Sequence, residues 1–127
     1  MERLAWVCLG GALGSGTRYL VATWAGRTLE SAFPFGTFIV NVAGSFLLMV
    51  VLELALSTEL VGPNLRLALT TGFMGGLTTY STFNYETLTL LRERAWLLAI
   101  GNVAFTLVSC LAAGVAGMTL VRRLVSH

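Results

Sequence analysis

The sequence contains no lysine, no aspartate and few charges of any kind. Its 127 residues include eight arginines and six glutamates, so charged residues make up only 11% of the chain. Soluble domains carry about 25% charged residues, whereas 56% of this chain is hydrophobic and its mean hydropathy is +0.81. These proportions indicate an integral membrane protein, with the lipid bilayer as its surroundings. The formal net charge of +2 gives no reason to expect a nucleic-acid partner.

Residues that commonly carry catalysis or bind metals are equally scarce. The two cysteines, Cys8 and Cys110, lie in apolar segments, where small buried thiols are more common than a disulfide or a metal pair. The single histidine is the last residue, and the sequence shows no phosphate loop and no base beside a serine or cysteine nucleophile. The sequence therefore predicts that the protein is not an enzyme.

Four long apolar segments account for most of the chain. We expect helices over about residues 4–24, 35–56, 65–91 and 96–121, each close to the ~20 residues that cross about 30 Å of hydrocarbon. Short polar connections separate the segments. The expected fold is all-α, with residues 1–127 forming a single transmembrane domain of four helices and no soluble catalytic domain.

Small residues in the first segment favour close packing between helices. Gly10 and Gly14 form a G-x-x-x-G pattern, which brings helix backbones together in membranes. Such patterns usually reflect packing and do not by themselves indicate an activity.

Arginine is distributed almost evenly between the two ends of the predicted bundle. Four spans place both termini on one side, which decides which arginines lie at each end. That side carries Arg3, Arg66, Arg122 and Arg123, and the other carries Arg27, Arg92, Arg94 and, if its side chain reaches that interface, Arg18. The positive-inside rule then assigns no orientation. Balanced charge is typical of a protein inserted in both orientations, for which an antiparallel dimer is the natural assembly. The alternative is one orientation, set by charges that this count weighs poorly.

The third segment contains a stretch that does not suit a continuous helix. Residues 71–83 read T-G-F-M-G-G-L-T-T-Y-S-T-F, with adjacent glycines and several hydroxyls. Unpaired backbone in hydrocarbon costs several kcal/mol per group, so a break is tolerated only inside protein or along a polar path. We expect a break at mid-membrane over residues 75–79, with a kinked helix as the alternative. Freed carbonyls there would suit a hard cation such as Na⁺, and half-helix N-termini would suit an anion.

Polar and aromatic side chains recur around this stretch at helical spacing. Thr79, Thr82 and Glu86 share one helix face and form a polar stripe. Tyr80 and Phe83 are three residues apart, and their positive ring edges would favour a small anion, although most such pairs only pack.

Three further polar residues in the predicted spans each have two interpretations. Arg18 either attracts an anion into a vestibule or anchors its helix at the interface. Asn41 offers an amide to an ion or forms a hydrogen bond between helices. Ser109 either faces a pore or bonds the carbonyl one turn before it.

Three motifs resemble those of the Fluc (CrcB) family of bacterial fluoride channels. They are G-G-A-L-G-S-G-T-R-Y at 10–19, P-F-G-T-F-I-V-N-V-A-G-S-F at 34–46, and the stretch at 71–83. The resemblance covers nearly the whole chain, and the last two motifs are highly specific. It implies a passive, selective channel that exports fluoride from the cytoplasm across the bacterial cytoplasmic (inner) membrane. It also implies an antiparallel, dual-topology homodimer with two pores.

The resemblance further assigns roles to individual residues. A structural Na⁺ at the dimer centre is expected on the backbone carbonyls of Gly75 and Thr78 from both chains, with no organic cofactor. The residues assigned to the fluoride pore are Asn41, Tyr80, Ser81, Thr82, Phe83 and Glu86, with Arg18 in the vestibule. Ser109 and Thr37 follow from weaker local similarity. Phe105 resembles the family's aromatic or histidine position in the fourth span, and it lacks the hydroxyl or ring nitrogen that some relatives have there. Tyr80 departs from the family pattern, which usually has phenylalanine there, and so adds a hydroxyl to a tight site.

Two other classes of membrane protein share some of these features. A small dual-topology multidrug and proton antiporter has a similar size and charge balance. It requires an acidic residue in the first span, where this chain carries Arg18 and no acid. A purely structural membrane protein would not need the hydroxyl stripe, the asparagine and the paired aromatic residues.

Overall fold

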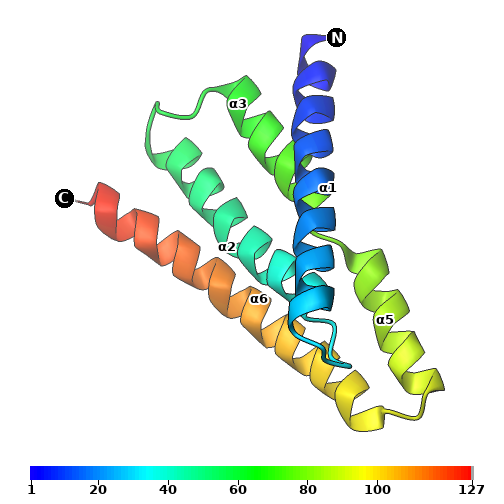
Figure 1. Ribbon diagram of the computed structural model, residues 1–127. Coiled ribbons are helices and arrows are strands. Elements are labelled where there is room, and N and C mark those ends of the chain that lie inside the picture. Colours follow the sequence, from blue (N-terminus) through cyan, green and yellow to red (C-terminus); the bar gives the residue numbers. More distant parts are fainter. Residues whose placement is uncertain (127) are drawn as a thin grey trace.

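The structure is a computed structural model that describes residues 1–126, and these residues form helices and no strand (Figure 1). The elements are α1 (Glu2–Thr28), α2 (Phe35–Ser57), α3 (Pro63–Leu67), η1 (Ala68–Met74), α4 (Gly75–Leu77), α5 (Tyr80–Arg92) and α6 (Trp96–Val125). The η1 segment has π-helical bonding. We call residues 63–92 the third arm, because α3, η1, α4 and α5 follow one another there. The predicted all-α fold is confirmed over these residues.

The helices agree with a helical membrane protein in length and composition. Within residues 1–126, two helices are long and apolar enough to cross a membrane, α2 and α6, with mean hydropathies of 2.2 and 2.0. The α1 helix carries Arg18 and several glycines, and the third arm is divided into shorter helices. The predicted membrane position of α1 and of the third arm therefore rests on sequence pattern and not on hydropathy alone.

Proline and one strained turn explain where several helices begin. Pro34 directly precedes α2, and Pro63 occupies the first position of α3, where a missing amide hydrogen costs no helical bond. Arg94 adopts a φ of 61° in the turn between α5 and α6. That left-handed conformation reverses the chain within three residues, so α5 and α6 become neighbours.

The first half of the third arm packs along α1 through glycine. Gly10 and Gly14 approach the arm so closely that a Cβ would overlap the carbonyl oxygens of Ala68 and Phe73. This contact confirms the close packing expected from the G-x-x-x-G pattern.

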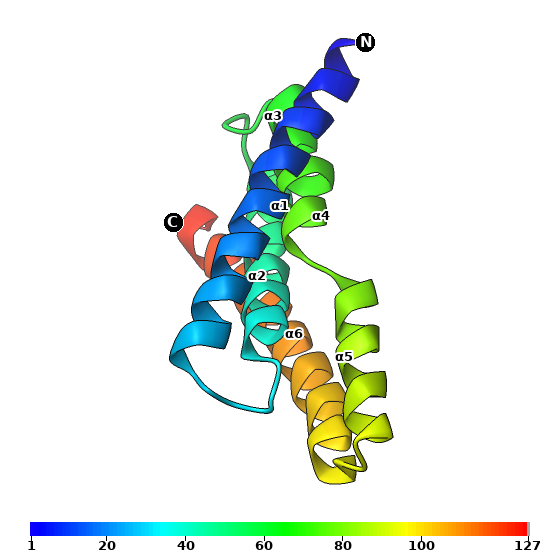
Figure 2. The ribbon, with the colours of Figure 1, turned by 45° about the vertical axis from the view of Figure 1, so that its right-hand side comes forward.

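The third arm changes its neighbours at its middle. Figures 1 and 2 show α3 and α4 beside α1, whereas α5 turns away and lies along the N-terminal part of α6. The side-chain amide of Asn102, which is 1% exposed, donates to Thr87 Oγ1 at 2.9 Å and accepts from Thr106 Oγ1 at 3.3 Å. A buried polar link therefore fixes α5 on α6.

Much of the outer surface is apolar. Large exposed side chains occur on every long helix, among them Leu13, Leu20, Leu56, Leu97 and Leu111. One ion pair joins α6 to α2, because Arg122 Nε lies 2.6 Å from Oε1 of the buried Glu53. An apolar exterior, with its buried carboxylate paired to an arginine, is what a bilayer or a second protomer requires.

Candidate functional site

The third arm is interrupted at Thr78 and Thr79. The α4 helix ends at Leu77, Thr78 (φ −80°, ψ 155°) and Thr79 (φ −153°, ψ 118°) are extended, and α5 begins at Tyr80. The interruption lies within the segment for which a break was expected, but it is shorter than residues 75–79. Residues 75–77 still complete a helical turn, because the Thr78 amide donates to the Met74 carbonyl at 2.9 Å. Its depth in a membrane stays a prediction.

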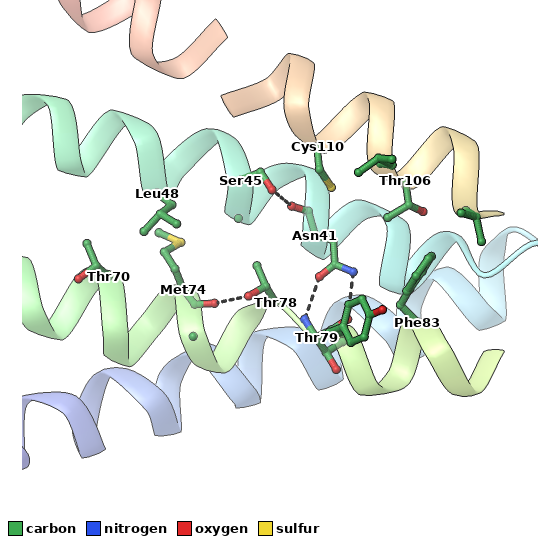
Figure 3. A pocket seen from close by; sticks show the side chains of 15 residues that line it. Asn41, Ser45, Leu48, Thr70, Met74, Thr78, Thr79, Phe83, Thr106 and Cys110 are labelled. Atoms are coloured by element: carbon green, nitrogen blue, oxygen red, sulfur yellow. Dashed lines mark hydrogen bonds between the residues drawn. The ribbon is translucent and has the colours of Figure 1, made fainter. Parts of the chain in front are cut away.

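Asn41 of α2 pairs with the extended backbone through both ends of its amide. Asn41 Oδ1 accepts the Thr79 amide hydrogen at 2.8 Å, and Nδ2 donates to the Thr79 carbonyl at 3.1 Å (Figure 3). In a continuous helix the Thr79 amide would bond the Gly75 carbonyl. Asn41 therefore frees that carbonyl, and it keeps one N–H for another acceptor.

Thr79 begins the next helix in a similar way. Its Oγ1 accepts the Thr82 amide hydrogen at 3.2 Å, as an N-cap does, and donates to Thr82 Oγ1 at 3.0 Å. In a continuous helix the Thr82 amide would bond the Thr78 carbonyl. That oxygen is instead 3.4 Å from Nη1 of Arg18 on α1. The two carbonyls predicted as cation ligands thus both lose their helical donors to a side chain.

Gly44 of α2 allows the interruption to lie against this helix. A Cβ at Gly44 would overlap Cγ2 of Thr78. The absence of a side chain therefore lets Thr78 sit directly on α2, one turn beyond the Asn41 contact.

A cavity of about 610 Å³ borders the interruption (Figure 3). It is lined from α2, the third arm and α6; the polar and aromatic residues among its walls are Asn41, Ser45, Thr70, Thr78, Thr79, Tyr80, Phe83, Thr106 and Cys110. The remaining walls are apolar or glycine. We call this the first cavity; a largely apolar space with a few converging polar groups is typical of a binding or conduction site.

The two predicted ring side chains lie together at this cavity. The ring centroids of Tyr80 and Phe83 are 5.8 Å apart with an interplanar angle of 46°. The Tyr80 side chain is largely exposed in the protomer, whereas Phe83 is half-buried. Both rings are available to a molecule at the cavity mouth.

A second cavity of about 440 Å³ gathers the charged candidates. Arg18, Thr37, Thr82 and Glu86 line it, and Thr79 borders both cavities. Thr37 Oγ1 donates to Glu86 Oε1 at 2.7 Å. Glu86 Oε2 is buried and meets no donor among residues 1–126. Thr37, which was assigned to the pore by weaker similarity, therefore lies in hydrogen-bond contact with Glu86, another residue assigned to the pore.

The structure does not bring every predicted pore residue to these cavities. Phe105 is 65% exposed, and within the described chain neither it nor Ser109 lines either cavity. Ser81 is exposed, with its hydroxyl 3.4 Å from Thr79 Oγ1. Their place in a pore stays a prediction.

The walls that α6 gives to the first cavity are Val103, Thr106, Leu107 and Cys110, and none of these was predicted as a site residue. A signal was present, since Asn102, Thr106 and Cys110 recur every four residues and so share one helix face.

Sequence comparisons relate this chain to one protein family and to several named proteins. Residues 5–118 match a family described as "CrcB-like protein, Camphor Resistance (CrcB)". A relative from Sorangium cellulosum is 52% identical over 126 residues, which is 99% of each chain. One from Anaeromyxobacter dehalogenans is 52% identical over 122 residues, covering 96% of this chain and 97% of the relative. One from Citrifermentans bemidjiense is 41% identical over 124 residues, covering 98% and 100%. All three relatives are named "Fluoride-specific ion channel FluC".

Proposed function

Because the chain belongs to the CrcB family, as its motifs predicted, we propose that it is a passive and selective fluoride channel that exports cytoplasmic fluoride. This is a family of ion channels and not of enzymes, so the prediction that the chain is not an enzyme is confirmed. We place the protein in the bacterial cytoplasmic membrane as a multi-pass protein. Flow would follow the electrochemical gradient and need no nucleotide.

The observation that carries the proposal is the chemistry around the interruption. Fluoride is small and strongly hydrated, so a narrow path must replace its water with donors at each step. Asn41, which has one N–H beyond its bond to the Thr79 carbonyl, lines the first cavity together with the rings of Tyr80 and Phe83, whose edges are positive. The hydroxyl of Thr82, beside Thr79, lines the second cavity. A series of neutral donors favours a small anion without trapping it.

We propose that two protomers assemble antiparallel, giving two fluoride pores in one dimer. The near-equal arginine count at the two ends supports insertion in both orientations. Two of those arginines are also engaged within the protomer, since Arg122 pairs with Glu53 and Arg18 reaches the Thr78 carbonyl. The exposed Gly75 and Tyr80 at the interruption would then face the second copy.

We also propose a structural Na⁺ between the two interruptions. Hard cations take oxygen ligands, and Na⁺ in membrane proteins is held by carbonyls of unwound helices. The carbonyls of Gly75 and Thr78 have lost their helical donors and fit this ligand type. Within residues 1–126 there is no cluster of His, Cys, Asp or Glu that could hold a metal. Na⁺ would supply a positive charge that joins backbone oxygens of two chains.

Flux from liposomes tests the channel function. Purified protein in liposomes loaded with fluoride or with chloride should release fluoride and retain chloride. Equal chloride release would contradict the proposed selectivity. A pH gradient applied without a membrane potential should drive no more fluoride movement than in protein-free liposomes, where neutral HF crosses the lipid; movement above that background would make the protein a proton-coupled exchanger and not a channel.

A further inference from the structure

We infer that Arg18 competes with the central cation for the Thr78 carbonyl and thereby lowers the affinity of the cation site for Na⁺. This inference rests on the proposed Na⁺ site. It adds a determinant of that site from α1, outside the interrupted segment that supplies the ligands.

The first step is the position of the guanidinium. Arg18 Nη1 lies 3.4 Å from the Thr78 carbonyl oxygen, sixty residues away in sequence. Arg18 is half-buried, and within residues 1–126 no carboxylate lies at salt-bridge distance from it. The carbonyl is therefore the polar group that the structure offers to this charge.

The second step is the availability of that oxygen. The helical donor for Thr78 is the Thr82 amide, which bonds Thr79 Oγ1 instead. A carbonyl without its helical donor is a stronger attractor for any cation, and a charged donor makes the stronger hydrogen bond. Arg18 and Na⁺ are therefore both attracted to the Thr78 carbonyl oxygen, because it lacks its helical donor.

The third step is that both cannot be accommodated without cost. Na⁺ bound at Thr78 would lie beside a guanidinium, and two like charges a few ångströms apart repel strongly away from bulk water. Arg18 has space to withdraw, because its side chain lines the second cavity, which also contains Glu86. Binding Na⁺ therefore includes the cost of moving Arg18 off the carbonyl.

Thermal unfolding against Na⁺ concentration tests the inference. The full-length protein in detergent is titrated with NaCl, with N-methylglucamine chloride holding the ionic strength constant. Arg18→Gln should lower the Na⁺ concentration for half-maximal stabilisation by about tenfold, the ratio expected for one charge-assisted hydrogen bond. The matched control is Arg27→Gln, an exposed arginine in the last turn of the same helix, which should titrate like the wild type.

A second measurement separates competition at the carbonyl from charge repulsion alone. Nitrogen-15 spectra of the arginine side chains should show an Nη signal that is absent in Arg18→Gln and that shifts as Na⁺ is added to the wild type. If Arg18 acts only through its charge, its Nη signal will not move as Na⁺ is added. That result overturns the inference.

The remaining outcomes of the Na⁺ titration separate the role of Arg18 from the existence of the Na⁺ site. Equal half-saturating Na⁺ in the wild type, Arg18→Gln and Arg27→Gln overturns the role of Arg18 and leaves the Na⁺ site standing. No Na⁺ dependence in any of the three overturns the Na⁺ site and the inference together. Fluoride conduction is judged separately, by the liposome flux.

Discussion

The first half of the third arm, residues 63–77, packs along α1, whereas the second half, α5, contacts mainly α6 and only part of α2. The first half buries Ala68, Gly72, Met74 and Leu77, and α5 buries only Leu90. Close backbone packing leaves no room for an ion between the first half and α1. The loosely packed α5 instead presents rings, hydroxyls and a carboxylate to two cavities. The interruption thus lets one arm act as scaffold and as site lining.

Replacing a ring on α5 tests the second half of this comparison and should have the largest effect. Phe83→Ile should reduce fluoride efflux from liposomes to the background of protein-free vesicles, because isoleucine offers no positive ring edge to the anion. The variant should still elute as an assembled dimer in size-exclusion chromatography. The control is Phe46→Ile on α2, a residue that lines neither cavity. Undiminished flux through Phe83→Ile would remove this residue from the path.

Filling the glycine contact tests the first half. Gly14→Ala should lower the free energy of unfolding by about 1–3 kcal/mol, since its methyl group would meet the Phe73 carbonyl and force the backbones apart. Gly16→Ala is the matched control, because no heavy atom of the described chain lies within 4 Å of a Cβ there. Denaturant titration measures both. Equal losses at the two positions would show that the contact of α1 with the third arm is not limited by space.

Breaking the buried link between α5 and α6 should have a moderate effect. Asn102→Leu leaves the hydroxyls of Thr87 and Thr106 without this partner, for an expected loss of about 1–2 kcal/mol of unfolding free energy. Asn84→Leu, at an exposed position of α5, serves as the control. If the Asn102 variant is as stable as the wild type, packing alone holds α5 on α6.

Removing the cap of α5 should give the smallest change. Thr79→Val loses the hydroxyl that accepts the Thr82 amide, which should cost about 1 kcal/mol of unfolding free energy, whereas Thr79→Ser keeps the cap. The pair is compared by thermal unfolding. A serine variant as weak as the valine variant would mean that the methyl group of Thr79, and not its cap, stabilises this junction.

Hydropathy and glycine spacing predicted most of the fold. The apolar runs of α2 and α6 and the glycines of α1 determine element type and close packing with little ambiguity. The length of the interruption was not predictable from composition, because it depends on two replacements of helical bonds, by Asn41 and by Thr79. Only the three-dimensional arrangement brings Asn41 to that backbone.

The rotation of α6 shows a second limit. A helix that is apolar almost all round gives little indication of which face meets its neighbours. The family resemblance assigned Phe105 and Ser109 to the pore, and their place there stays a prediction, whereas the walls that α6 gives to the first cavity include Thr106 and Cys110. The four-residue recurrence of Asn102, Thr106 and Cys110 marks the face of α6 that turns toward its neighbours, since buried polar groups need partners.

The pairing of Asn41 with Thr79 has a consequence for how freely position 41 accepts substitution. Its side chain presents one acceptor and one donor, side by side, to a backbone amide and carbonyl of the same residue. Aspartate would present two acceptors, leucine neither group, and glutamine the right groups on a longer stem. A saturation library at position 41 should therefore tolerate fewer residue types than is usual for a half-buried position, because asparagine alone satisfies both hydrogen bonds.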